Sequence, residues 1–186
     1  NLSEQYHQIS DPRTKDFIVV SLSAFKRKEV IPFLLKAIKS DDPNIALHAL
    51  LGLGNMPAGV FTKWSVVEDI LFNSKDNGML QSAIFILATH KVPTAKNKLQ
   101  TFLKSDNDLL KYSAAIALIN FKEPAALPLL KSILALEKFD APHRLEGLKM
   151  NILTGLEREG WGVLNSEIKF LADNEKNLKV KAKARG

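Results

Sequence analysis

Residues 42 to 54 read DPNIALHALLGLG, and this stretch determines how the rest of the chain is interpreted. The side chain of Asp42 can accept an orphan backbone N–H at a helix start, and Pro43 suits the first helical position because it has no N–H to leave unpaired. The following residues are almost all apolar or small, so the stretch is expected to be a helix buried between neighbours. Gly52, Gly54 and Asn55 are expected to end it.

The same pattern recurs at four further places. Helix-start signals stand at residues 11, 42, 76, 107 and 141, spaced by 31, 34, 31 and 34 residues. Core positions follow seven and eleven residues after each start: Ile18, Ala49, Ala83, Ala114 and Leu148 at the first, and Leu22, Leu53, Leu87, Leu118 and Ile152 at the second. Agreement at two core positions in five copies predicts an internal repeat.

Segments of a second kind lie between these helices, for example VIPFLLKAIKS at 30–40 and ALPLLKSILAL at 126–136. Each has one apolar stripe and a polar remainder, which is typical of an outer helix that covers one side of an inner helix. The sequence therefore predicts an all-α, right-handed superhelix of about five helix pairs, with a C-terminal capping helix at 166–171. The fifth inner helix is expected to present the polar face of a terminal repeat, formed by Arg144, Glu146, Lys149 and Asn151.

Two stretches carry a resemblance to a known family. LLKAIKSDDPNIALHALLGLG at 34–54 and FLKSDNDLLKYSAAIALIN at 102–120 resemble HEAT-like repeats of the short bacterial type that is also found in phycobilisome lyases, within the armadillo-like α-solenoids. The resemblance extends over roughly residues 11 to 156. It implies a helical solenoid, and it implies little about activity, because the family includes scaffolds, adaptors and a few enzymes.

Composition and charge agree with one globular repeat domain. Of the 186 residues, 46% are hydrophobic and 25% are charged, no run is long enough to span a membrane, and there is no cysteine to form disulfides. The net charge is +6, but residues 176–186 (KNLKVKAKARG) hold five basic residues and no acid, so the rest carries only +1. We predict a repeat domain at 1–175 and a basic, flexible tail at 176–186.

The chain begins at Asn1, as a processed product or an excised fragment would, and the compartment stays open with the cytoplasm slightly favoured.

No catalytic or metal-binding arrangement is visible. The HEAT-like hydroxylases bind iron through repeated His-Glu pairs, and none of the four histidines here is followed by glutamate. His48, on an otherwise apolar helix, is interpreted as a satisfied core or groove histidine, and Trp64 as core packing. Phosphate-loop, dinucleotide and nucleophile-elbow motifs are absent. We expect a non-enzymatic protein with no cofactor and no metal.

Nucleic-acid binding is the first alternative function. Some HEAT-like proteins are DNA glycosylases that act on alkylated bases through cations, aromatic residues and a carboxylate on their concave face. The corresponding row here is mixed and matches no motif residue by residue: it comprises Arg13, Asp16, Gln81, Tyr112, Arg144 and Glu146. A purely structural segment of a longer protein is the second alternative.

An apolar row on the inner helices is the main functional clue. Positions five and nine after each start share one helix face, which is distinct from the face of the small core residues. The hypothesis is that this face lines the groove of the stack and binds a peptide or helix of a protein partner. The candidate partner-binding residues are Leu47, Leu51, Phe85, Tyr112 and Ile116. The competing interpretation, weighted equally, is that outer helices cover them.

Overall fold

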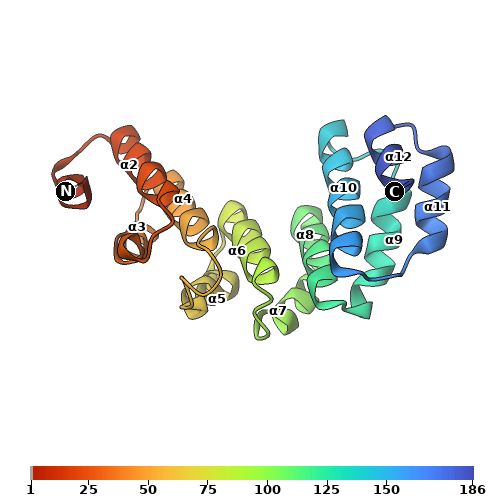
Figure 1. Ribbon diagram of the computed structural model, residues 1–186, viewed down its shortest axis with the longest axis horizontal. Helices are drawn as coiled ribbons and strands as arrows, with labels where there is room; N and C mark the ends of the chain where they lie inside the picture. The colour runs from red at the N-terminus through yellow and green to blue at the C-terminus, as the bar shows by residue number, and fades with distance from the viewer. Residues whose placement is uncertain (1) are drawn as a thin grey trace. The chain divides into compact units, whose positions relative to one another are not determined.

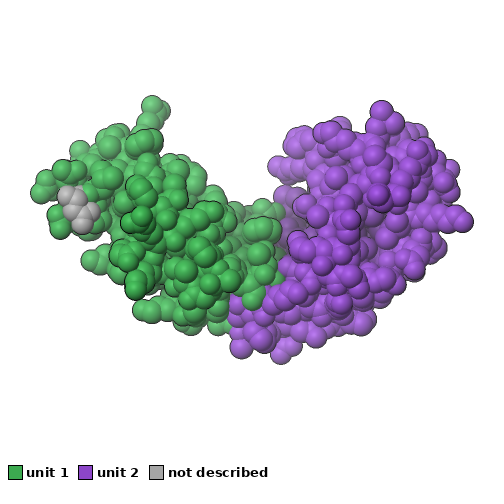
Figure 2. Space-filling view, in the orientation of Figure 1, with its two compact units in different colours: residues 1–90 green, residues 91–186 purple. Residues whose placement is uncertain are grey.

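The structure, a computed structural model, describes residues 2–186, and all regular structure in that range is helical (Figure 1). The chain divides into two compact units, residues 1–90 and residues 91–186 (Figure 2). The predicted all-α helical-repeat fold is thereby confirmed. None of the helices in this range combines the length and the apolar character needed to cross a membrane.

The first unit is built from three inner helices and their outer partners. Inner helix α4 packs against α2 on one side and against α6 on the other, while α3 packs on α4 and α5 packs on α6. The helices of this unit are α1 (Leu2–Gln5), α2 (Pro12–Ala24), α3 (Ile31–Ala37), α4 (Pro43–Gly54), α5 (Trp64–Asn73) and α6 (Asn77–Thr89).

The second unit repeats the arrangement. Inner helix α10 packs against α8 and α12, while the outer helices α7, α9 and α11 lie against α8, α10 and α12. The helices of this unit are α7 (Ala95–Phe102), α8 (Asp108–Leu118), α9 (Leu127–Ala135), α10 (Pro142–Glu159), α11 (Asn165–Asn174) and α12 (Leu178–Ala184). The predicted capping helix is α11, and it forms a hairpin with α12.

Capping side chains start the inner helices at the predicted residues. The carboxylate of Asp42 accepts hydrogen bonds from the backbone N–H groups of Asn44 and Ile45, at 2.9 and 3.3 Å. Equivalent side-chain caps start α2, α6 and α8; they come from Asp11, Asp76 and Asn107. Each cap satisfies backbone donors that the first helical turn leaves unpaired.

The predicted core positions are buried in nearly every copy. All five residues at the eleventh position are buried, and so are four of the five at the seventh position. Leu148, in the fifth copy, is the exception and is half-buried. Position eight is also a core position in the first four copies, where it holds Val19, Leu50, Ile84 and Ala115.

Of the two glycines expected to end α4, Gly52 lies inside the helix, whereas Gly54 is its last residue as predicted. α4 continues through Gly54, and Asn55 is its C-cap. A Cβ atom at Gly52 would collide with the Ser23 side chain of α2, and one at Gly54 would collide with the Ile86 side chain of α6. These glycines therefore allow neighbouring inner helices to approach closely.

The C-terminal segment differs from the expected flexible tail. Residues 178–184 form α12, with Val180 fully buried. The Asn177 side chain caps this helix by accepting from the N–H groups of Lys179 and Val180, at 3.0 and 3.1 Å. Before each of the caps at 42, 76 and 107, a serine hydroxyl two residues earlier accepts the cap N–H, and before Asn177 the Glu175 carboxylate does the same. Helices α11 and α12 thus form a sixth hairpin of the repeat.

A covering hairpin also changes the interpretation of α10. The sequence suggested that its polar residues formed the exposed face of a terminal repeat. Instead, α12 packs on α10, and Lys149 is only 5% exposed. The polar side chains of α10 are partly used for contacts with the sixth hairpin: Glu146 accepts from Asn177 and Lys179, and Glu157 pairs with Lys183.

Candidate partner-binding surface

The apolar row lies on the side of the inner helices that faces away from the buried positions. A helix advances about 100° per residue, so the ninth position after each start lies opposite the midpoint of the seventh and eleventh. The accessibilities agree with this geometry. In the first unit, Val20 is 45% exposed, Phe85 is 65% exposed, and Leu51 between them is half-buried.

The first unit places three of the five predicted residues on neighbouring helices. Leu47 and Leu51 lie one turn apart on α4, both half-buried, and Phe85 is exposed on α6, which packs against α4. With Val20 on α2 they follow three consecutive inner helices. We refer to Val20, Leu47, Leu51 and Phe85 as the apolar row of the first unit.

A polar pair lies beside this row. Nδ1 of His48 on α4 is 2.5 Å from Oδ1 of Asp16 on α2, and both side chains are partly exposed. The interpretation of His48 as a hydrogen-bonded histidine is therefore confirmed. Because the carboxylate can only accept, Nδ1 carries the proton of this bond, and Nε2 remains as a second polar atom at the edge of the surface.

The second unit holds the other two predicted residues. Tyr112 and Ile116 lie one turn apart on α8, and both are half-buried. The Tyr112 ring has its centroid 5.6 Å from that of Phe139, and the Lys111 ammonium lies 5.6 Å from the same tyrosine ring. None of the five predicted residues is fully covered. Their role in binding stays a prediction.

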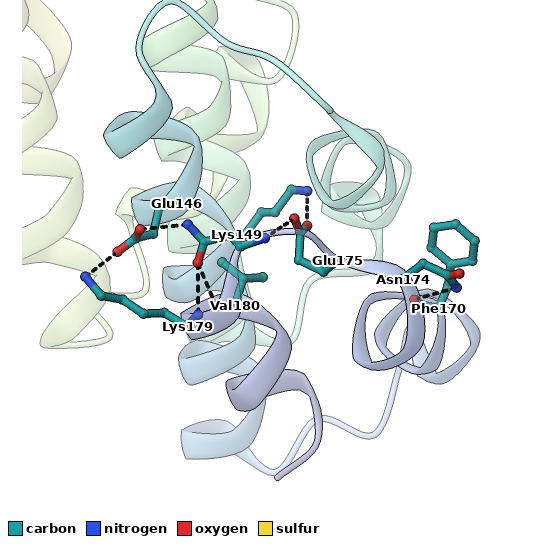
Figure 3. Close-up of polar contacts among 8 residues, drawn as sticks. Glu146, Lys149, Phe170, Asn174, Glu175, Lys179 and Val180 are labelled. Carbon is teal, nitrogen blue, oxygen red and sulfur yellow. Dashed lines mark hydrogen bonds and ion pairs between the residues drawn. The ribbon is translucent and has the colours of Figure 1, made fainter.

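Sequence reasoning missed a pocket in the second unit. It has a volume of about 650 Å³ and lies among the segment that joins α9 to α10, the helices α10 and α11, and the start of α12. Lys149 and Glu175 line it and form an ion pair at 2.6 Å (Figure 3). The feature of the sequence that points to this pocket is the lysine at the eighth position of the fifth copy, where the other four copies have an apolar residue.

Hydrogen bonds lower the pKa of the carboxylates around this pocket. For Glu146 the principal cause is the side-chain amide of Asn177, followed by the Lys179 ammonium. Burial raises the pKa of Glu175, but the hydrogen bond from Lys149 and two backbone N–H groups outweigh it, so the net shift is downward. Both groups are therefore carboxylates at neutral pH. Across residues 2–186, no three histidine, aspartate or glutamate side chains gather closely enough to hold a metal ion.

Successive antiparallel helix pairs, with capped inner helices and a repeated buried pattern, define the chain as an α-helical repeat protein. Comparison with known families gives the particular class. The sequence model of HEAT repeats matches residues 65–145, from α5 into α10. This central part of the chain thus matches HEAT repeats, in agreement with the resemblance seen in the sequence. No curated protein matches it. HEAT repeats commonly mediate protein–protein interaction.

Proposed function

We propose that the chain is a non-catalytic protein-binding module that holds a peptide or helix of a partner against the exposed side of its inner helices. The observation that carries the proposal is the apolar row of the first unit, above all Phe85, which is 65% exposed on an inner helix. Adjacent exposed apolar side chains on a soluble surface usually mark an interaction site.

The chemistry of the row suits a protein partner better than a nucleic acid. Its four side chains are aliphatic or aromatic and none is a cation, whereas phosphate contacts require lysine or arginine. An amphipathic helix could place its apolar face on Val20, Leu51 and Phe85, since packed helices lie about 8–10 Å apart and anchors seven residues apart on one helix face are separated by about 10.5 Å. The Asp16–His48 pair would then hydrogen-bond to polar groups of the partner at the rim.

The test compares two variants of the first unit, one that places charges on the apolar row and one that places a charge elsewhere. Leu51→Glu with Phe85→Glu charges the apolar row. Phe25→Glu charges a phenylalanine that is 60% exposed at the end of α2, about 140° around the helix from the row position. Each tagged protein is used to capture partners from an extract of its source cells, with quantitative mass spectrometry as the readout.

We expect partners captured by the unmodified chain to be lost, by about tenfold or more, with the double variant and retained with Phe25→Glu. Circular dichroism must show that both variants keep their helical content. Equal capture by all three proteins would contradict the proposal.

A further inference from the structure

Lys149 occupies a core position of the repeat. The eighth position after each helix start is almost completely buried in the other copies, which hold Val19, Leu50, Ile84 and Ala115 there. Lys149 is 5% exposed and is the only charged or polar residue that is buried within residues 2–186. The fifth copy thus places an ammonium group where the repeat otherwise places an aliphatic side chain.

Glu175 is a second departure from the pattern, and it is linked to the first. The residue two before the side-chain cap is Ser40, Ser74 or Ser105 in the second, third and fourth hairpins, and it is Glu175 in the sixth. Its carboxylate accepts from Lys149 at 2.6 Å. A buried ion pair usually stabilises a fold no better than apolar residues of the same size, so packing alone does not account for the two departures.

The ion pair faces a space large enough for a small ligand. The pocket of about 650 Å³ falls within the size range of small-molecule sites. Apart from the charged groups, its wall is largely apolar, with Leu134, Leu136, Phe139, Leu145, Phe170 and Leu171. Figure 3 shows Lys149 and Glu175 meeting beside Val180, where the segment before α12 passes α10.

The polar end of the pocket has hydrogen-bond donors on Lys149 that the protein does not use. A lysine ammonium has three N–H donors, and Glu175 accepts one of those on Lys149. Both oxygens of Glu175 are engaged, since Oε2 accepts from Lys149 and Oε1 accepts from the backbone N–H of Asn177 at 3.0 Å. A bound hydrogen-bond acceptor would complement the two remaining N–H donors of Lys149.

The remaining donors of the buried Lys149 ammonium favour an anionic acceptor, because charge-assisted hydrogen bonds are stronger than neutral ones. Lys179 offsets Glu146 at 3.0 Å, and Lys149 offsets Glu175. The lining itself is balanced, with Lys138, Lys149 and Lys176 against Glu137, Glu146 and Glu175, and Lys179, which lies outside the lining, adds one positive charge beside Glu146. We propose that this pocket binds a small amphipathic carboxylate, with its carboxylate on the Lys149 ammonium and its alkyl chain against the apolar wall.

The experiment titrates the full chain with decanoate by isothermal calorimetry, below the concentration at which decanoate forms micelles. Decylammonium, with the same alkyl chain and the opposite charge, is the ligand control. The main variant is Lys149→Met with Glu175→Ser, which places an apolar residue and a serine at the two positions where the second, third and fourth hairpins have them. Lys169→Met, at an exposed lysine of α11 that does not line the pocket, is the control variant.

We expect saturable binding of decanoate to the unmodified chain and to Lys169→Met. Binding should weaken about tenfold or more in the double variant, and decylammonium should bind about tenfold or more weakly to the unmodified chain, because each change removes a charge-assisted hydrogen bond. Absence of saturable binding to the unmodified chain overturns the proposal, as does equal affinity of the double variant or of decylammonium. The outcome is independent of protein binding by the apolar row, which uses residues of the first unit.

Discussion

At the scale of single residues, two glycines illustrate how the inner helices pack. Gly54 lies in α4, where a Cβ would overlap the buried Ile86 side chain of α6, while Gly147 lies in α10 with no atom within 4 Å of a Cβ added there. Both are helical, so the same substitution separates intrinsic helix propensity from packing.

Gly54→Ala is expected to lower the free energy of unfolding by about 1–3 kcal/mol, because the added methyl group overpacks the α4–α6 contact. Gly147→Ala is expected to raise it by about 0.5–1 kcal/mol, because alanine is the better helix former. Urea denaturation followed by circular dichroism measures both values. Equal effects of the two substitutions would show that α4 and α6 do not approach as closely as described.

Lys149 and Glu175 allow a second stability test. Lys149→Met alone is expected to destabilise the second unit by about 2 kcal/mol, since it leaves the poorly exposed Glu175 carboxylate without its partner. Adding Glu175→Ser is expected to recover most of that loss, because an apolar residue and a serine then stand at these two positions, as they do in the second, third and fourth hairpins. Urea unfolding of the two variants provides the comparison, and a double variant less stable than the single one would be the contrary result.

At the scale of elements, α12 is held to α10 by one buried side chain and several polar contacts. Val180 is fully buried, and Glu146 accepts from Asn177 at 2.8 Å and from Lys179 at 3.0 Å. Lys183 also pairs with Glu157 of α10. A helix of seven residues is too short to be stable alone, so α12 depends on these contacts.

Acid should therefore release α12 before the rest of the second unit unfolds. The pKa of Glu146 is lowered from 4.5 in the folded chain, so its stabilising contribution is present above that pH and is lost as the pH falls through the lowered value. The pKa of Glu175 is also lowered in the folded chain, so its contribution to stability is lost over the same acidic range. We expect amide-exchange protection of α12 to decrease below about pH 4.5, while α8 stays protected.

Hydrogen exchange between pH 6 and pH 3, corrected for the intrinsic rate, measures this effect. Glu146→Gln serves as the matched control and should show a weaker pH dependence in α12. Protection of α12 that stays constant down to pH 3 would argue against the role assigned to these carboxylates.

The elements differ in how far the sequence predicts them. The inner helices follow from their caps and from apolar residues with helical spacing, as in Asp42 with Leu53. The sequence does not predict α12, because its apolar residues alternate with basic residues in a period of two and only Val180 among them is buried; they are Leu178, Val180, Ala182 and Ala184. The sequence does not indicate that Lys149 is buried, because charged side chains are rarely buried unless they are paired, and its partner lies 26 residues away.

At the scale of the whole molecule, most of the basic side chains behind the positive net charge are engaged within the protein, so we expect weak binding to DNA. Five of the six excess charges lie in residues 176–186. Several of these basic groups already contact the protein: Lys179 pairs with Glu146, Lys183 pairs with Glu157, and Lys181 and Arg185 donate to backbone carbonyls of α11. A DNA-binding face would require cations that remain available to phosphates.

Binding to a DNA duplex is therefore expected to be weaker than about 100 μM at about 0.15 M salt, at or below the weak end of non-specific binding. Fluorescence anisotropy of a labelled duplex across a salt series measures it. A dissociation constant of about 1 μM with a steep salt dependence would instead make nucleic-acid binding the leading function.

The central claim is that the exposed side of the inner helices holds a protein partner. The most direct measurement replaces Phe85 by a photo-crosslinking phenylalanine analogue, irradiates the protein in its source cells, and compares the adducts with those formed from position 25. We predict a discrete protein adduct at position 85 and none at position 25, because only the former lies on the apolar row. No adduct at position 85, or the same adducts at both positions, would contradict the claim.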